Sequence, residues 1–184
     1  MPYSEPTNLA IIACPGGEVF ANEVIAHLRH MYKHRFNLKR DVISKRYEVE
    51  KDALFKDINY YNDLQTSDRG VRGSVANYRP PEFKVNCEFT YFMNGEFKTE
   101  IKDCIRGKDV FIFQDIENHE EISLNGGKNK LKLSVNDHVM CLLVTIDAVR
   151  QAGAKNITLV LPAYPYSRQH KKKSREGLTA ALLG

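Results

Sequence analysis

Three runs of consecutive apolar residues stand out along the chain and predict buried strands. They are LAIIAC at 9–14, KDVFIFQD at 108–115 and NITLVLP at 156–162. Each run has the length of a strand and lies beside polar or turn-forming residues. Because the runs are continuous rather than alternating, they are typical of strands that are covered on both faces, as in a parallel sheet.

Helical spacing appears between these strands. Apolar residues recur every three or four positions over 18–34 and again over 139–149, which predicts two amphipathic helices. Asn136 and Asp137 are suited to cap the second helix, and Gly153 is suited to end it. The closing stretch LTAALLG predicts the start of another helix. Strands that alternate with helices predict an α/β fold, a parallel sheet flanked by helices with right-handed crossovers.

The composition changes over residues 36–86, which are rich in charge and tyrosine and contain a Pro-Pro break. We interpret this range as an inserted segment, partly helical around 48–58 and irregular near 66–81. The whole chain of 184 residues is then interpreted as a single, incomplete domain, 1–184, that carries the insertion.

Two further segments have their own patterns. Alternation in EFTYFM, 88–93, and in GEFKTEI, 95–101, predicts a β-hairpin. Residues 117–134 are polar and contain glycine, so we expect a loop there.

Charge and hydropathy narrow the classes of function. The chain has 27 basic and 23 acidic residues, a net charge of +4 that is too small to indicate a nucleic-acid partner. A nucleic-acid-binding domain that uses the lysine-rich segment near the end of the chain is therefore the weaker alternative. No run of eighteen apolar residues occurs, and the amino-terminal MPYSEPTN does not resemble a signal peptide. We expect a cytoplasmic protein without membrane contacts.

The cysteines and histidines do not form a recognisable motif. Cys14, Cys87, Cys104 and Cys141 are scattered without a CxxC pair, and we expect most of them to be reduced and buried. The P-loop and the GxGxxG fingerprint are absent.

Three histidines, His27, His30 and His34, share one face of the first predicted helix. We interpret them as part of a cationic face near the end of that helix rather than as metal ligands, and we expect no metal site in the chain. His119 and His138 are interpreted as surface or capping residues.

A basic loop directly follows the third apolar run. Residues 164–175, YPYSRQHKKKSR, contain five lysines and arginines together with His170. Charge runs are usually solvated loops. A polar loop at the carboxyl end of a buried parallel strand is, however, where open α/β sheets bind ligands, so this loop is a candidate anion site.

The stretch YFMNGEF, 91–97, joins a turn to possible ligand chemistry. Asn94 and Gly95 between apolar residues are typical of a hairpin turn. Phe92 and Glu96 add an aromatic face that could stack on an adenine and a carboxylate that could accept from its exocyclic amine.

Four stretches in order carry a resemblance to a known family. They are FMNGEFKTEI (92–101), IRGKDVFIFQD (105–115), the long stretch 136–169 that begins NDHVMCLL, and KSREGLTAALL (173–183). Together they resemble the amino-terminal half of ribose-phosphate diphosphokinase, and they cover about half of the chain. LAIIAC and the helix after it are a weaker match.

The resemblance implies a phosphoribosyltransferase-like amino-terminal domain that binds ATP. In this family MgATP gives its diphosphoryl group to the C1 hydroxyl of ribose 5-phosphate, forming 5-phosphoribosyl diphosphate and AMP, and Mg²⁺ enters with the nucleotide. The matching residues imply an adenine loop at Phe92, Asn94 and Glu96, generally contributed by a neighbouring subunit, so a homo-oligomer is expected. The pair Arg168 and Gln169 would reach the nucleotide and its phosphates.

A phosphate or regulatory region is implied by the resemblance at four further positions, which are Arg106, Lys173, Ser174 and Arg175. The loop that holds three of them is one residue shorter than the usual pattern, and His170 stands where an aspartate is common. The ranges 36–86 and 116–134 are longer than usual.

The later family elements that hold the metal-binding histidine, the catalytic loop and the ribose-phosphate loop do not appear in the sequence. We therefore expect the isolated chain to lack the ribose 5-phosphate site and to be inactive, and we assign no catalytic residue. The alternative is a non-catalytic regulatory homologue that binds nucleotide or phosphate and associates with a catalytic subunit.

Overall fold

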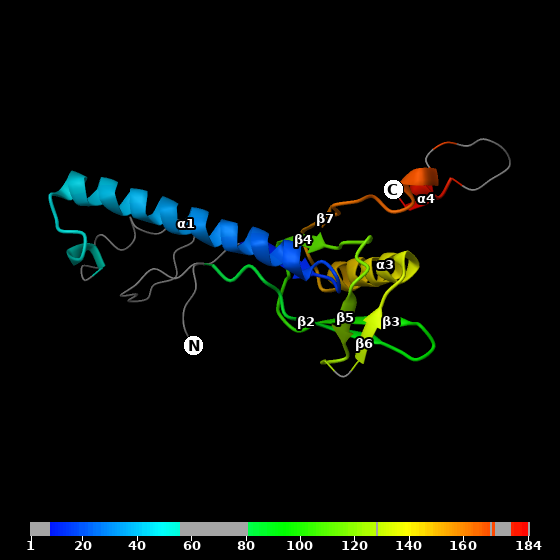
Figure 1. Cartoon of the computed structure of the whole chain (residues 1–184). Coiled ribbons are helices and arrows are strands. Elements are labelled where there is room, and N and C mark those ends of the chain that lie inside the picture. The colour runs from blue at the N-terminus through cyan, green and yellow to red at the C-terminus, as the bar shows by residue number, and fades with distance from the viewer. Residues whose placement is uncertain (1–7, 56–80, 128, 170, 172–177, 184) are drawn as a thin grey trace. The chain divides into compact units, whose positions relative to one another are not determined.

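The computed structural model of the chain describes residues 8–55, 81–127, 129–169, 171 and 178–183 (Figure 1). These residues divide between two compact units. One unit comprises residues 1–8 and 22–83, and the other comprises residues 9–21 and 84–184.

The larger unit is built on a parallel sheet of three strands. These are β1 (Leu9–Ala13), β4 (Asp109–Phe113) and β7 (Asn156–Val160), in the order β1-β4-β7. The three strands pair without a stagger, from Leu9 beside Asp109 and Asn156 to Ala13 beside Phe113 and Val160. The three apolar runs thus form the three strands that the sequence predicts, and β4 lies between the other two.

Helices connect or follow these strands, which confirms the predicted α/β fold with a parallel sheet and flanking helices. α1 (Glu18–Tyr47) follows β1, α3 (Val135–Gln151) precedes β7, and α4 (Thr179–Leu183) lies near the end of the chain. α3 begins at Val135, before the predicted cap at Asn136 and Asp137. Ser134 is its N-cap, and Asp137 completes a capping box by accepting from the backbone N–H of Ser134.

Two β-hairpins pack in the same unit. The predicted hairpin is present as β2 (Cys87–Tyr91) and β3 (Phe97–Ile101). The prediction of a loop over 117–134 was wrong, because β5 (Glu121–Leu124) pairs there with β6 (Asn129–Lys132). Exposed and buried residues alternate along β5, with Ile122 and Leu124 facing inward. This alternation is too short to stand out in a segment that is polar on average.

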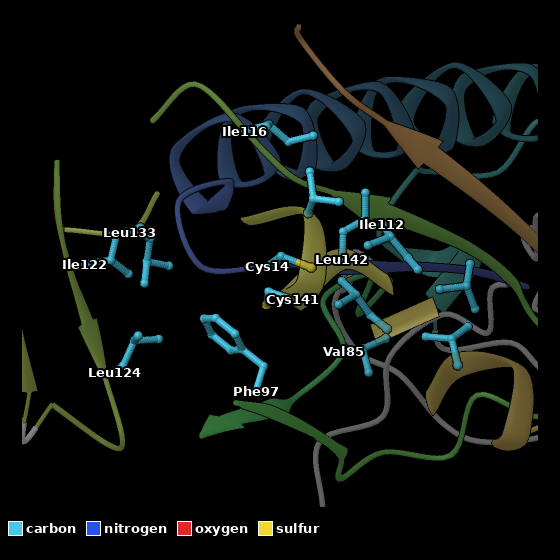
Figure 2. Close-up of a cluster of buried hydrophobic side chains, with 14 of the residues drawn as sticks. Cys14, Val85, Phe97, Ile112, Ile116, Ile122, Leu124, Leu133, Cys141 and Leu142 are labelled. Carbon is cyan, nitrogen blue, oxygen red and sulfur yellow. The ribbon is translucent and has the colours of Figure 1, made fainter. Parts of the chain in front are cut away.

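The core of the larger unit joins the sheet, α3 and both hairpins. Figure 2 shows Cys14 and Cys141 close together among side chains such as Ile112, Leu142 and Phe97. Both of these cysteines are buried, whereas Cys87 is half-buried and Cys104 is exposed. Burial raises the pKa of the Cys87 thiol to about 12, so this thiol behaves as a neutral core group.

A buried polar group links three elements of this core. The hydroxyl of Thr145 on α3 lies 3.0 Å from the hydroxyl of Thr99 on β3 and donates to the carbonyl oxygen of Cys141. The thiol of Cys14, the residue after β1, donates to the hydroxyl oxygen of Thr145 over 3.7 Å. A buried hydroxyl is costly without partners, so these contacts favour one way of packing α3 between the strands.

The smaller unit contains most of α1. The predicted helix over 18–34 is too short, since the helix continues to Tyr47 and buries Phe36 and Ile43 against Leu54. The smaller unit also contains a short 3₁₀ helix, η1 (Ala53–Phe55), which lies within the range 48–58 that was predicted to be partly helical. Residues 56–58 of that range, and residues 66–80 of the range predicted to be irregular, lie outside the described residues. The extra length also corrects the interpretation of the three exposed histidines, which lie mid-helix rather than near its end.

The interpretation of His138 as a surface or capping residue was wrong, because its side chain is fully buried. The side-chain amide of Gln114 donates from its Nε2 to the Nδ1 of His138 over 2.9 Å. The ring Nε2 of His138 therefore carries the proton, and it faces the carbonyl oxygen of Asn118 at 3.2 Å. Burial lowers the pKa of His138 below its usual value, with the nearby carbonyl and carboxylates opposing part of that shift.

The stability of the chain should therefore decrease as the pH falls below about 6.5, where the unfolded state gains a proton that the folded His138 does not accept. The slope from this residue is at most about 1.4 kcal/mol per pH unit. Urea unfolding at pH 7.5 and pH 5.5 checks this against His138→Gln, which cannot titrate. Equal pH dependence in the two proteins would contradict it.

Candidate functional site

Two loops at the carboxyl ends of β1 and β4 pack tightly against each other. A Cβ atom at Gly17 would lie 2.7 Å from the carbonyl oxygen of Phe113, so a side chain at this position would force the two loops apart. The side-chain amide of Gln114 donates to the carbonyl oxygen of Pro15, and the side-chain amide of Asn118 donates to the carbonyl oxygen of Gly16. This edge of the sheet is fixed by side-chain hydrogen bonds.

The loop after β7 leaves from the same edge and contains the first pair of predicted site residues. Arg168 and Gln169 lie in the 3₁₀ helix η2, Ser167–Gln169, and the side chain of Arg168 is exposed. The loop is held to the amino terminus of α3, since the hydroxyl of Tyr166 donates to the side-chain oxygen of Asn136. His170, Lys173, Ser174 and Arg175 lie outside the described residues.

The β2–β3 turn contains the second group of predicted site residues. The N–H of Phe92 donates to the carbonyl oxygen of Glu96 over 2.9 Å, and the N–H of Gly95 donates back to that of Phe92. Gly95 has a φ of 89°, which glycine adopts without steric cost. The side chain of Asn94 accepts from the N–H of Glu96. The sequence therefore specifies a three-residue turn over 93–95 that Asn94 closes from inside.

The register of the hairpin places Phe92 and Glu96 directly opposite each other, so their side chains share one face. Phe92 is 44% exposed and Glu96 is exposed. Tyr91 and Phe97 occupy the other face, where their rings meet edge to face with centroids 4.9 Å apart. The turn thus buries one aromatic pair and presents an aromatic side chain and a carboxylate together to solvent.

The charges beside this face are largely paired. Lys98 and Lys102 lie 3.3 and 2.6 Å from the carboxylate oxygens of Glu100. The hydrogen bonds from Lys102 and then Lys98 hold the pKa of Glu100 below its usual range. Because Glu100 contacts Lys98, this ammonium is directed along β3 and away from the carboxylate of Glu96.

The two groups of predicted site residues do not meet within one chain. Figure 1 shows the β2–β3 turn on one side of α3 and the segment after β7 on the other. A ligand that contacts both groups would need them from two copies of the chain.

Arg106 lies at the opposite edge of the sheet from Arg168. It precedes β4, and its side-chain carbons lie about 3.5 Å from the position of a Cβ atom at Gly153, just before β7. A five-residue strand separates these edges by roughly 17 Å. The assignment of Arg106 to a phosphate or regulatory region stays a prediction.

Asn125 was not singled out in the sequence, and it contacts the predicted site. It lies in the β5–β6 turn with a φ of 54°, and its side chain bonds both backbone groups of Tyr91, the residue before Phe92. The Asn-Gly-Gly sequence indicates a turn at this position but not its partner. Nearby, a groove of about 360 Å³ is lined by residues that include Glu18, Phe89 and Gly127.

Among the described residues, no three histidine, cysteine, aspartate or glutamate side chains gather in a way that could hold a metal ion. Over the same residues, no helix combines the length and apolar character needed to cross a membrane.

The chain is similar to known proteins in sequence and in fold. Curated proteins named ribose-phosphate pyrophosphokinase match over 98 residues, with identities of 42% in Staphylococcus saprophyticus, 39% in Corynebacterium ammoniagenes and 38% in Bacillus subtilis. The matched region is 53% of this chain, and it spans about a quarter, 26%, of each relative.

A solved structure titled phosphoribosylpyrophosphate synthetase from Mycobacterium smegmatis shares the fold. Its TM-score is 0.52 at 22% identity, and the match covers 96% of this chain and 37% of that one. The family model described as the N-terminal domain of ribose phosphate pyrophosphokinase matches residues 74–184, which is more than half of the chain. The chain therefore belongs to the ribose phosphate pyrophosphokinase family, and its residues 74–184 correspond to the family's N-terminal domain.

Proposed function

We propose that this chain is the ATP-binding portion of a ribose-phosphate pyrophosphokinase that transfers the diphosphoryl group of MgATP to ribose 5-phosphate. The observation that carries the proposal is the β2–β3 turn, where Phe92 and Glu96 stand opposite each other on an exposed face. The phenylalanine is 44% exposed, so its ring offers a stacking surface to a flat base, and the adjacent carboxylate offers an acceptor to an amino group on that base.

The adenine would bind on this face. The ring of Phe92 would stack on the base, and the carboxylate of Glu96 would accept a hydrogen bond from its exocyclic amine. Asn94 closes the turn through the N–H of Glu96, so it would act by fixing the direction of the Glu96 backbone. Because Glu96 accepts but does not donate when ionised, this arrangement would favour adenine over guanine, which has a carbonyl oxygen at the matching position.

The phosphates would bind at the loop after β7. The exposed guanidinium of Arg168 has a planar fork of parallel donors that matches two phosphate oxygens, whereas the ammonium of a lysine acts as a point charge without this geometry. Gln169 follows it in η2. The loop begins at the carboxyl end of β7 and is tied to α3 through Tyr166, so this charge would be held in place before the ligand arrives.

The reaction would be an in-line displacement. The C1 hydroxyl oxygen of ribose 5-phosphate would form a bond to the β-phosphorus of ATP while the bond from that phosphorus to the oxygen bridging to the α-phosphorus breaks. AMP would leave with the bridging oxygen, and the hydroxyl proton would be released. Mg²⁺ would enter bound to the ATP phosphates and offset their charge, and Arg168 would stabilise the charge that moves between them.

The separation of the two groups within one chain supports an oligomeric site. Phe92 and Glu96 of one copy would supply the adenine contacts, and Arg168 and Gln169 of another would supply the phosphate contacts. The affinity for ATP would then increase with the concentration of the chain until the oligomer is fully formed.

Replacement of Phe92 by alanine should weaken ATP binding by about 5- to 150-fold, the range for losing one base–aromatic stack. Binding of inorganic triphosphate should not change, because it has no base. Calorimetric titration of both ligands checks this. Met93→Ala is a matched control, since Met93 lies next to Phe92 in the same turn and is fully exposed. Equal losses for ATP and triphosphate would exclude an adenine contact at Phe92.

A charge-conserving pair of variants tests the phosphate contacts. Arg168→Lys should weaken both ATP and inorganic triphosphate by about 10- to 150-fold, because the bidentate contact is lost although the charge is kept. Lys171→Arg, at an exposed position in the same loop, should leave both affinities within about twofold. If Arg168→Lys binds both ligands as the unchanged chain does, the assignment of Arg168 is wrong.

The transfer itself can be tested in a chimera that carries residues 84–184 of this chain in place of the matching region of the Bacillus subtilis relative. It should release AMP from MgATP only when ribose 5-phosphate is present, and Phe92→Ala in the chimera should raise the KM for ATP. A folded chimera that binds ATP but releases no AMP would contradict the catalytic proposal and favour the non-catalytic regulatory homologue.

A further inference from the structure

The β5–β6 hairpin reaches the proposed adenine turn through one side chain. The amide oxygen of Asn125 accepts from the N–H of Tyr91 over 2.8 Å, and its amide nitrogen donates to the carbonyl oxygen of Tyr91 over 3.0 Å. A planar amide that makes both contacts imitates the backbone of a neighbouring strand. Asn125 therefore continues the sheet at the point where β2 ends and the turn begins.

The hairpin register explains why Tyr91 needs such a partner. Phe92 and Glu96 form the hydrogen-bonded pair that closes the turn, so the preceding pair, Tyr91 and Phe97, is a non-hydrogen-bonded pair. The N–H and C=O of Tyr91 consequently point away from β3, toward the open edge of the hairpin. Without Asn125 both groups would depend on water, and the last residue before Phe92 would be held from one side only.

Asn125 is itself well anchored. It directly follows Leu124, which is 3% exposed and belongs to the same buried cluster as Phe97 (Figure 2). Its φ of 54° lies in the left-handed region, which asparagine tolerates better than most residues, and the N–H of Gly127 closes the turn on the carbonyl oxygen of Leu124. The side chain is therefore directed at Tyr91 by backbone that is fixed on both sides.

We propose that Asn125 is a positioning residue for nucleotide recognition, which holds the turn over 92–96 in the conformation that presents Phe92 and Glu96 to the adenine. This inference rests on the proposed function of that turn. Asn125 acts through Tyr91 and does not contact the nucleotide. The β5–β6 hairpin is accordingly a brace for the adenine-binding turn rather than a connection between β4 and α3 alone.

The test compares the 184-residue chain with Asn125→Gly, which keeps the left-handed backbone but removes the amide. ATP should bind about five- to tenfold more weakly, because the competent turn is less populated, and inorganic triphosphate should bind unchanged. Asn125→Asp can still accept from the N–H of Tyr91 but places a carboxylate oxygen against its carbonyl oxygen, so it should also bind ATP more weakly than the unchanged chain. Ser123→Ala, at an exposed position on the same hairpin, is the control and should bind ATP as the unchanged chain does.

A double-mutant cycle separates positioning from a general loss of stability. If Asn125 acts through the turn, its replacement should have little further effect on ATP binding once Phe92 is alanine. Additive losses, or equal losses for ATP and triphosphate in Asn125→Gly, would overturn the proposal.

Hydrogen exchange gives a second reading that does not depend on ATP. The amides of Phe92 and Gly95, which close the turn, should exchange at least about fivefold faster in Asn125→Gly, while the amide of Cys14 in the sheet should not change. Unchanged exchange at the turn would overturn the proposal. If the unchanged chain binds no ATP, the proposed function fails, and the proposed role of Asn125 in nucleotide recognition fails with it. Faster exchange would then show only that Asn125 orders the turn.

Discussion

The hydrogen bonding of β4 on both of its edges is the constraint on which the rest of the larger unit depends. Asp109–Phe113 pairs in parallel with β1 and β7 over the same five positions, and Val110 and Ile112 are fully buried. Because all three strands point the same way without a stagger, the loops after them leave from one edge. That edge contains the loops around Gly17 and Gln114 and the loop that presents Arg168.

The hairpins serve the other half of the proposed site. β2 and β3 are held to α3 through the hydroxyls of Thr99 and Thr145, and β5 and β6 are held through Ile122 and Leu124. Alternation lets each hairpin strand bury one face while the other stays exposed. The consequence is a turn whose base is fixed in the core and whose exposed face remains open to a ligand. Rigid support beneath an exposed turn is what preorganised binding would require of it.

Features set by interactions between neighbouring residues could be predicted from the sequence, and features set by residues distant in the sequence could not. The strands and the β2–β3 turn follow from apolar runs and from Asn94 and Gly95, which are local signals. The sequence did not reveal that His138 is buried, because its position at the start of a helix suits a solvent-exposed residue equally well. Only the folded chain brings Gln114 and Asn118 to its ring. The β5–β6 hairpin was missed because short alternation within a polar stretch is a weak signal.

The sequence by itself determined the three buried strands, their alternation with helices, the β2–β3 turn and the resemblance that implies roles for the residues of that turn. These properties depend on spacing and on the backbone preferences of neighbouring residues. The tertiary structure alone decided that the turn and the segment after β7 lie on opposite sides of α3, and that the amide of Asn125 bonds to Tyr91. The two residues of that contact are separated by 34 positions. Local preference does not specify such a partner, because it is set by how the packed core orients both hairpins.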